Sequence, residues 1–120
     1  MSQITNSKIY DLEERTYSFA RRVVALVKLL PKTVSNIELS KQLVRAAGSV
    51  GANYIEANES LGRRDFMMRI RISKKETKEA RYWLRLIDFN SREIENEKNR
   101  LLQETEELAK IFGSILEKSK

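Results

Sequence analysis

The chain has 120 residues, of which 41% are hydrophobic, and its 23 basic and 17 acidic side chains give a net charge of +6 at pH 7. A chain of this length is expected to form one small domain, which buries about two-thirds of its unfolded surface and gains stability from oligomerisation. The absence of cysteine and histidine excludes disulfides, zinc-thiolate sites, imidazole bases and Cys/His nucleophilic pairs, so we expect neither an enzyme nor a bound metal or cofactor.

No stretch of the sequence approaches the roughly 18 uninterrupted apolar residues that a membrane-spanning helix needs. The amino terminus, residues 1–7, has no apolar signal region, so we expect a cytoplasmic protein without membrane contact. Residues 1–10 are predicted to form a flexible tail, and residues 11–118 a single domain.

The spacing of apolar residues predicts two long helices in the first half of the chain. One proline and four glycines in the whole sequence leave few residues that break helices. The first helix is expected to follow the N-cap residue Asp11 and to end before Pro31. The second is expected over residues 37–59, with Asn36 as its N-cap and Asn53 at a core position of its heptad.

Two further helices are predicted in the second half. The third is expected over residues 64–89, and a fourth follows a polar link over residues 90–96. The fourth helix repeats its core positions in steps of four and three residues: Leu101, Thr105, Leu108, Phe112 and Ile115. Four such helices joined by short links are expected to form an all-α, antiparallel up-down-up-down four-helix bundle.

The positive charge is concentrated on the third predicted helix. Residues 63–85 carry nine basic and three acidic side chains, against eight and six in residues 1–62 and six and eight in residues 86–120. On a helical wheel, basic side chains of this helix fall on one flank: Arg71, Lys74, Lys75, Lys78, Arg81 and Arg85. Such a stripe is suited to follow a phosphate backbone, and Tyr82 beside it offers a stacking surface. The alternative is a solvated helix face without a ligand.

The second predicted helix carries a stripe of polar residues. Steps of three and four residues place them along one strip of the helix: Gln42, Arg45, Ser49, Asn53 and Glu56. We expect Arg45, Asn53 and Glu56 to form a polar network among helices or subunits, because buried charges persist only when paired. Direct contact with a ligand is the alternative. A di-metal centre would need Glu-x-x-His motifs, which a chain without histidine cannot supply.

Both central helices also carry a second stripe of apolar or small residues outside the core seam. On the second helix these are Val44, Gly48, Gly51, Ala52 and Ile55, and on the third they are Ile72, Trp83 and Leu86. A four-helix monomer needs one apolar stripe per helix, so the second stripes predict burial against another subunit. The alternative is a monomer in which the first and fourth helices cover them.

The polar stripe and its surroundings resemble a bacterial four-helix-bundle family associated with 23S rRNA intervening sequences. The resemblance lies in the run 41–57, Asp65-Phe66, Glu76, Glu79 and Tyr82-Trp83-Leu84. It covers roughly residues 12–112, and the spacing Gln-x-x-Arg-x-x-x-Ser-x-x-x-Asn-x-x-Glu is specific. The resemblance implies a ring-shaped homopentamer of bundles around a central channel. It also implies that the polar network includes the other motif residues: Gln42, Ser49, Glu76 and Glu79. The family is also similar in fold to the accessory variability proteins of diversity-generating retroelements, which bind a reverse transcriptase and nucleic acid.

Two functions follow as hypotheses. The first is a non-catalytic, oligomeric protein whose basic stripe binds the backbone of RNA or DNA without reading sequence. The second is an accessory scaffold that docks a reverse transcriptase or another protein through the same surface, as the resemblance implies.

Overall fold

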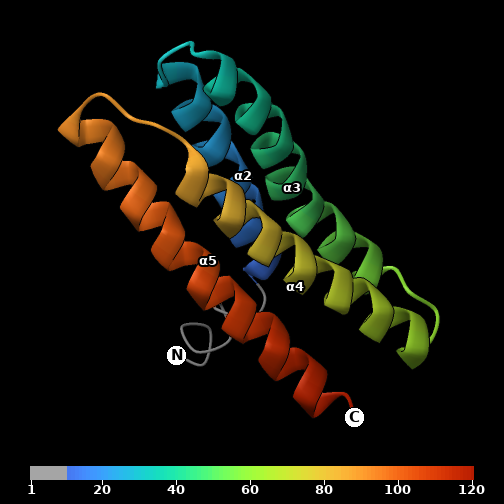
Figure 1. Ribbon diagram of the computed structural model, residues 1–120. Coiled ribbons are helices and arrows are strands. Elements are labelled where there is room, and N and C mark those ends of the chain that lie inside the picture. Colours follow the sequence, from blue (N-terminus) through green and yellow to red (C-terminus); the bar gives the residue numbers. More distant parts are fainter. Residues whose placement is uncertain (1–10) are drawn as a thin grey trace.

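The computed structural model describes residues 11–120, which form four helices and, within that range, no strand. The helices are α2 (Leu12–Leu29), α3 (Val34–Asn58), α4 (Arg63–Leu86) and α5 (Arg92–Lys118). Figure 1 shows them lying side by side, with the chain turning back at each connection. The prediction of an all-α fold of four helices is therefore confirmed. The predicted tail over residues 1–10 lies outside the described part of the chain.

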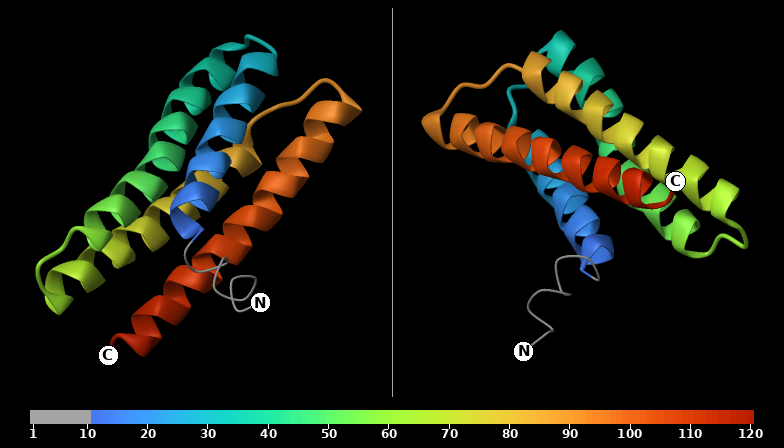
Figure 2. Two further views of the ribbon diagram at one scale, coloured as in Figure 1. Left: turned by 180° about the vertical axis from the view of Figure 1, so that it is seen from behind. Right: turned by 90° about the horizontal axis from the view of Figure 1, so that it is seen from below.

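Each helix contributes one apolar stripe to a shared core. α3 packs against α2 and α4, and α5 packs against α4 and α2; Figure 2 shows this arrangement from behind and from below. Fully buried side chains come from every helix, including Phe19 of α2, Leu43 of α3, Leu84 of α4 and Phe112 of α5. Burial of these stripes is the main source of stability in a bundle of this kind.

α2 occupies the predicted segment, from directly after Asp11 to two residues before Pro31. Asp11 stands at the N-cap position, but its side chain makes no capping hydrogen bond. Its backbone carbonyl oxygen instead accepts a hydrogen bond from the Arg15 amide at 2.7 Å. The prediction that the Asp11 side chain caps the helix was therefore wrong.

The start of α3 also differs from the prediction. Thr33 is the N-cap residue, and its hydroxyl accepts a hydrogen bond from the Asn36 amide at 3.1 Å. The Asn36 side chain is buried, where its amide donates to the carbonyl oxygens of Pro31 and Asp88 and its oxygen accepts from the Asp88 amide. Asn36 therefore ties the α2–α3 turn to the α4–α5 connection, because its side chain bonds across the bundle instead of capping its own helix.

The connection between α4 and α5 is shorter than predicted. α4 ends at Leu86 because Ile87 adopts extended backbone while its side chain stays in the core. α5 begins at Arg92, since the Ser91 hydroxyl caps its first turn by accepting a hydrogen bond from a backbone amide at 3.1 Å. The polar residues that suggested a link to residue 96 belong to the solvent-facing first turns of this helix.

Ion pairs join α2 to α5. Arg15 lies 2.7 Å from a carboxylate oxygen of Glu104 and 2.7 Å from one of Glu107. Arg22 makes two hydrogen bonds of 3.0 Å to the two carboxylate oxygens of Glu97. The hydrogen bonds that Arg22 donates lower the pKa of Glu97 below its ordinary value. Those that Arg15 donates to the Glu104 carboxylate raise the pKa of Arg15. The Glu97 carboxylate is therefore held in its charged form.

Acidification is expected to remove the contribution of the Arg22–Glu97 pair. Because the pKa of Glu97 is lowered in the folded state, the pair stabilises the fold above the ordinary glutamate pKa of about 4.3 and ceases to do so as the pH falls through the lower folded-state value. Replacing Arg22 by Gln should lower the free energy of unfolding by less than about 1 kcal/mol at neutral pH, since the pair is partly exposed. At about pH 2 the two proteins should unfold at the same urea concentration. A difference that persists in acid would mean that Arg22 acts through packing and not through charge.

Candidate nucleic-acid interface

Three of the six basic side chains predicted to bind nucleic acid are engaged within the chain. Lys75 pairs with Glu79 at 3.8 Å along α4, and Arg81 pairs with Glu106 of α5 at 3.2 Å. Lys74 is half-buried, and its ammonium group lies against the surface of α5. These three cations fasten α4 to itself or to its neighbour, so they offer less charge to a ligand than the helical wheel suggests.

The other three predicted cations, Arg71, Lys78 and Arg85, are exposed, and none has an ion-pair partner within residues 11–120. Arg64 shares these properties and was missed by the sequence prediction. It lies seven residues before Arg71, and residues seven apart on a helix fall on nearly the same line, with a drift of about 20° per step. We call Arg64, Arg71, Lys78 and Arg85 the outer row of α4. Their regular spacing of seven is the sequence signal that identifies Arg64.

The predicted polar network is present in two separate pieces, of which Arg45 forms the first. Its guanidinium lies 3.4 Å from a carboxylate oxygen of Glu79 and 3.9 Å from one of Glu76. Glu76 is only 7% exposed, and its Oε1 atom has no hydrogen-bond partner within the described residues. Because 3.9 Å exceeds hydrogen-bonding distance, Arg45 acts on Glu76 as a neighbouring positive charge and not as a hydrogen-bond donor.

Asn53 forms the second piece. Its side-chain amide donates to the Ser49 carbonyl oxygen at 2.9 Å, and its oxygen accepts a hydrogen bond from Arg69 of α4 at 3.1 Å. Asn53 is half-buried and lies beside α4, whereas the side chain of the next residue, Tyr54, is buried in the core. The prediction of Asn53 in the heptad core was therefore wrong. Arg69, on the opposite flank from the basic stripe, was not predicted as its partner.

The two ends of the polar stripe do not join either piece. The side chains of Gln42 and Glu56 are exposed and make no hydrogen bond or ion pair among residues 11–120. Glu56 is engaged only through its backbone carbonyl oxygen, which accepts from the Ser60 hydroxyl at 3.1 Å. The described residues therefore form no continuous network along α3, because the first and last residues of the polar stripe, Gln42 and Glu56, are exposed to solvent.

Gly48 and Gly51 of α3 have different surroundings. Gly51 lies against α2, where an added Cβ atom would stand 3.0 Å from Oγ1 of Thr16, so the absence of a side chain at Gly51 lets α3 pack closely against α2. At Gly48, no atom of the described residues lies within 4 Å of such a Cβ position. A hollow of ≈ 300 Å³ separates this part of α3 from Tyr17 of α2. The members of the second stripe that are exposed on α3 are Val44, Gly48, Ala52 and Ile55.

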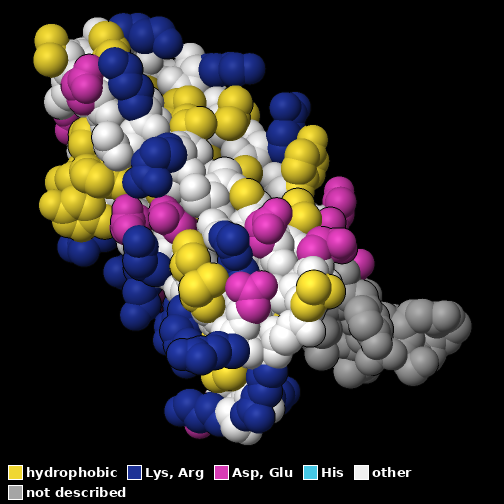
Figure 3. All heavy atoms as spheres, turned by 90° about the vertical axis from the view of Figure 1, so that its right-hand side faces the viewer, with side chains coloured by type: hydrophobic (Ala, Val, Ile, Leu, Met, Phe, Trp, Pro, Cys, Tyr) yellow, Lys and Arg dark blue, Asp and Glu magenta, His cyan; other side chains and the backbone are white. Residues whose placement is uncertain are grey.

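The second stripe of α4 is more covered than predicted. Ile72 and Trp83 are half-buried, and Trp83 packs against the hydrophobic core, with its Nε1 atom buried and without a hydrogen-bond partner in the described range. Only Leu86 is largely open, at 45% exposure. Figure 3 shows yellow apolar side chains in several separate groups on one face, with dark blue Lys and Arg side chains gathered over its lower part. On this face, the exposed apolar surface is therefore divided by charged groups.

Alanine substitutions at the two glycines of α3 are expected to have opposite effects. Gly48→Ala should raise the free energy of unfolding by roughly 1 kcal/mol, because alanine favours the helix and meets no neighbour among residues 11–120. Gly51→Ala should lower it by about 1 kcal/mol, since the added methyl group crowds Thr16. Urea denaturation at one protein concentration measures both.

Light scattering on the same two variants separates packing within the chain from packing between subunits. If Gly48 lies at a subunit contact, Gly48→Ala should also reduce the size of the assembly. Equal stability changes for both variants would contradict the distinct surroundings of the two glycines.

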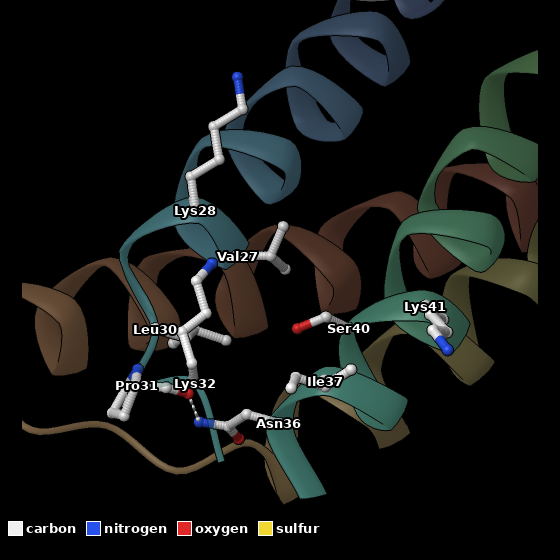
Figure 4. A pocket seen from close by; sticks show the side chains of 9 residues that line it. All are labelled: Val27, Lys28, Leu30, Pro31, Lys32, Asn36, Ile37, Ser40 and Lys41. Carbon is white, nitrogen blue, oxygen red and sulfur yellow. Dashed lines mark hydrogen bonds between the residues drawn. The ribbon is translucent and has the colours of Figure 1, made fainter. Parts of the chain in front are cut away.

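A hollow of ≈ 310 Å³ lies where α2 passes into α3. Figure 4 shows Val27, Leu30 and Ile37 around it, with the Ser40 hydroxyl pointing inward and the Lys28 side chain pointing away. Its lining includes no carboxylate or histidine, so it does not provide the usual acid–base groups of an active site. Within residues 11–120, no group of three acidic side chains is placed to hold a metal ion, and no helix has the length and apolar character to cross a membrane.

These features define an all-α, four-helix protein with a basic outer row. The chain belongs to the 23S rRNA-intervening sequence protein family, which matches residues 8–114. Its fold is similar to the crystal structure of a protein with unknown function from the S23 ribosomal protein family of Bacteroides thetaiotaomicron, with 32% sequence identity and a TM-score of 0.74. That similarity covers 87% of this chain and 96% of the other. No curated protein matches the chain.

The family match confirms the resemblance carried by the polar stripe of α3 and its neighbours on α4. The structural relative confirms the four-helix fold independently. Neither match concerns the accessory proteins of retroelements, so that similarity stays a prediction.

Proposed function

We propose that this protein is a non-catalytic, oligomeric protein of the cytoplasm that binds the backbone of RNA or DNA through the basic face of α4. The outer row carries the proposal, because four exposed cations without partners in the described chain share one line of a single helix. Contacts of lysine and arginine with phosphates are independent of sequence and weaken with salt. Binding of this kind needs no catalytic group.

We further propose that antiparallel bundles of this chain assemble as a ring-shaped homopentamer, as the family resemblance implies. The exposed side chains of Val44, Ile55 and Leu86, at 37%, 45% and 45% exposure, support this assembly. A small protomer gains stability when such side chains are buried against another subunit. Assembly would also repeat the outer row, so that several copies act on one nucleic acid.

A second candidate is a scaffold that docks a reverse transcriptase or another protein with an acidic surface. Met68, Tyr82 and Leu86 are exposed on α4 among its basic residues. Aromatic residues, methionine and arginine are enriched at protein interfaces, which favours a protein partner for this face. An acidic protein that co-purifies at moderate salt after nuclease treatment would support the scaffold.

Fluorescence anisotropy of a labelled structured RNA and a matched DNA duplex tests the first proposal. The purified oligomer should bind with micromolar or tighter affinity at low salt, and the affinity should fall steeply toward physiological salt. No binding of either probe at low salt would overturn nucleic-acid binding and leave the scaffold as the better candidate.

A further inference from the structure

We propose that the ligand of α4 is single-stranded nucleic acid, which lies along the outer row with one base stacked on Tyr82. This inference rests on the proposed function and specifies its ligand. Three observations carry it: the spacing of the four cations that have no ion-pair partner within residues 11–120, the contacts made by the other cations of α4, and the position of Tyr82.

The outer row forms a regular track. Its members are seven residues apart, so successive side chains are about 10.5 Å apart along the helix axis and the whole row spans about 31 Å. The drift of about 20° per step turns the track only slowly around the helix. All four side chains are exposed and without an ion-pair partner in residues 11–120, so their charges are available to successive parts of one backbone.

Each of the remaining five basic residues of α4 contacts another residue, on this helix or elsewhere in the chain. Arg63 donates a hydrogen bond to the carbonyl oxygen of Ser119, and Arg69 donates to the side-chain oxygen of Asn53. Lys74, Lys75 and Arg81 are engaged with α5 or with α4 itself, as described above. Within residues 11–120, the nine cations of this helix therefore divide into five with a structural contact and four without an ion pair or side-chain hydrogen bond, and those four form the outer row.

Tyr82 adds an aromatic surface to this track. It follows Lys78 by four residues and precedes Arg85 by three, so it neighbours both on the helix surface. The residue is 55% exposed, and its ring stands edge-on to that of Trp83, with 5.1 Å between ring centroids and an interplanar angle of 74°. Because Trp83 packs against the core, it braces the tyrosine ring while leaving ring surface open to a ligand.

A cationic track combined with an exposed aromatic ring suits a single strand better than a duplex. Proteins that bind single strands pair a positive path for the backbone with aromatic side chains on which bases stack. The bases of a duplex are stacked on one another, and its backbone curves away from a path along one helix. A single strand can follow the outer row and place a base on Tyr82.

The test compares a labelled oligouridine of about 20 nucleotides with an RNA duplex of the same length, using the full chain and anisotropy over a range of salt concentrations. The row variant replaces all four cations by glutamine: Arg64→Gln, Arg71→Gln, Lys78→Gln and Arg85→Gln. The control variant removes the same charge from exposed residues elsewhere: Arg21→Gln, Lys28→Gln, Lys32→Gln and Arg92→Gln. Loss of four phosphate contacts should make the slope of log K against log salt less negative by about 2.8 for the row variant, and the control should keep the slope.

Single substitutions at Tyr82 test the stacking contact. Tyr82→Ala should weaken binding of the oligouridine about 5- to 150-fold, the effect expected for loss of one stacked base. Tyr82→Phe keeps the ring and should bind within about twofold of the natural protein. Circular dichroism of both variants checks that the helices are intact, which the exposure of Tyr82 leads us to expect.

The outcomes separate this inference from the proposed function. Tighter binding of the oligouridine than of the duplex, with losses in the row variant and in Tyr82→Ala, supports a single-stranded ligand. Duplex binding that equals or exceeds single-strand binding, or full affinity in Tyr82→Ala, overturns the single-stranded ligand and leaves backbone binding in place. If neither probe binds at low salt, both the single-stranded ligand and the proposed binding of nucleic acid are overturned.

Discussion

Reversing the charge of Arg71, Lys78 and Arg85 to glutamate is expected to weaken binding of RNA or DNA by roughly a hundredfold or more at near-physiological salt. Each substitution turns a phosphate contact into a repulsion, and phosphate contacts supply most of the affinity in sequence-independent binding. These side chains make no ion pair within residues 11–120, so helicity and assembly should be preserved. Anisotropy measures the affinity, with circular dichroism and light scattering as checks on the fold.

A matched triple variant controls for net charge. Arg21, Lys28 and Lys32 are also exposed, lie on α2 or just beyond it, and lack ion-pair partners in the described range. Their reversal to glutamate changes the charge equally but should leave most of the affinity. If it weakens binding as much as the α4 variant does, the overall charge of the protein and not the α4 face governs the interaction. Lys75 and Arg81 are unsuitable for this comparison because their reversal would also break ion pairs.

Phe112→Ala is expected to lower the free energy of unfolding by about 3–5 kcal/mol, the cost of removing a buried phenylalanine and leaving a cavity. Phe112 has no exposed surface, and its ring centroid lies 6.2 Å from that of Tyr54, which joins α5 to α3 in the core. A small domain has few kcal/mol to lose, so the variant should unfold at a much lower urea concentration. Circular dichroism during urea denaturation at a fixed protein concentration measures the difference.

Phe89→Ala is the control of the same residue type. Phe89 is 41% exposed and lies between α4 and α5, with the Lys98 ammonium 5.2 Å from its ring centroid. Its removal should cost less than about 1 kcal/mol, since an exposed cation–π contact contributes little. Similar losses in both variants would contradict the placement of Phe112 in the core.

The repeat of apolar residues was sufficient to predict the helices, because the side that faces the core determines which positions must be apolar. Leu12, Phe19 and Val23 of α2 are buried as their spacing indicates. The boundaries were less predictable where a side chain acts across the bundle. Asn36 has the chemistry of an N-cap, but its partner Asp88 is 52 residues away, and a local pattern contains no information about such a contact.

In the candidate interface too, contacts between helices could not be predicted from a local sequence pattern. A helical wheel placed the basic residues of α4 on one flank, but it could not distinguish Arg81 from Lys78. That distinction depends on Glu106 of α5, whose distance from Arg81 is determined by the packing of two helices. The sequence alone was sufficient to include Arg64 in the basic row, since its spacing of seven residues from Arg71 places both on one line of the helix. The division of the polar stripe into two pieces depends on Arg69 and Glu76, which approach α3 only in the folded bundle.

Photo-crosslinking tests the central role of α4 most directly. A 4-thiouridine-containing RNA bound to the purified protein is irradiated, and the cross-linked peptides are identified by mass spectrometry after trypsin digestion. We expect cross-links on α4, above all in the peptide of residues 82–85, which contains Tyr82 and ends at Arg85. Efficient cross-links confined to α2 or α5 would contradict binding through the outer row.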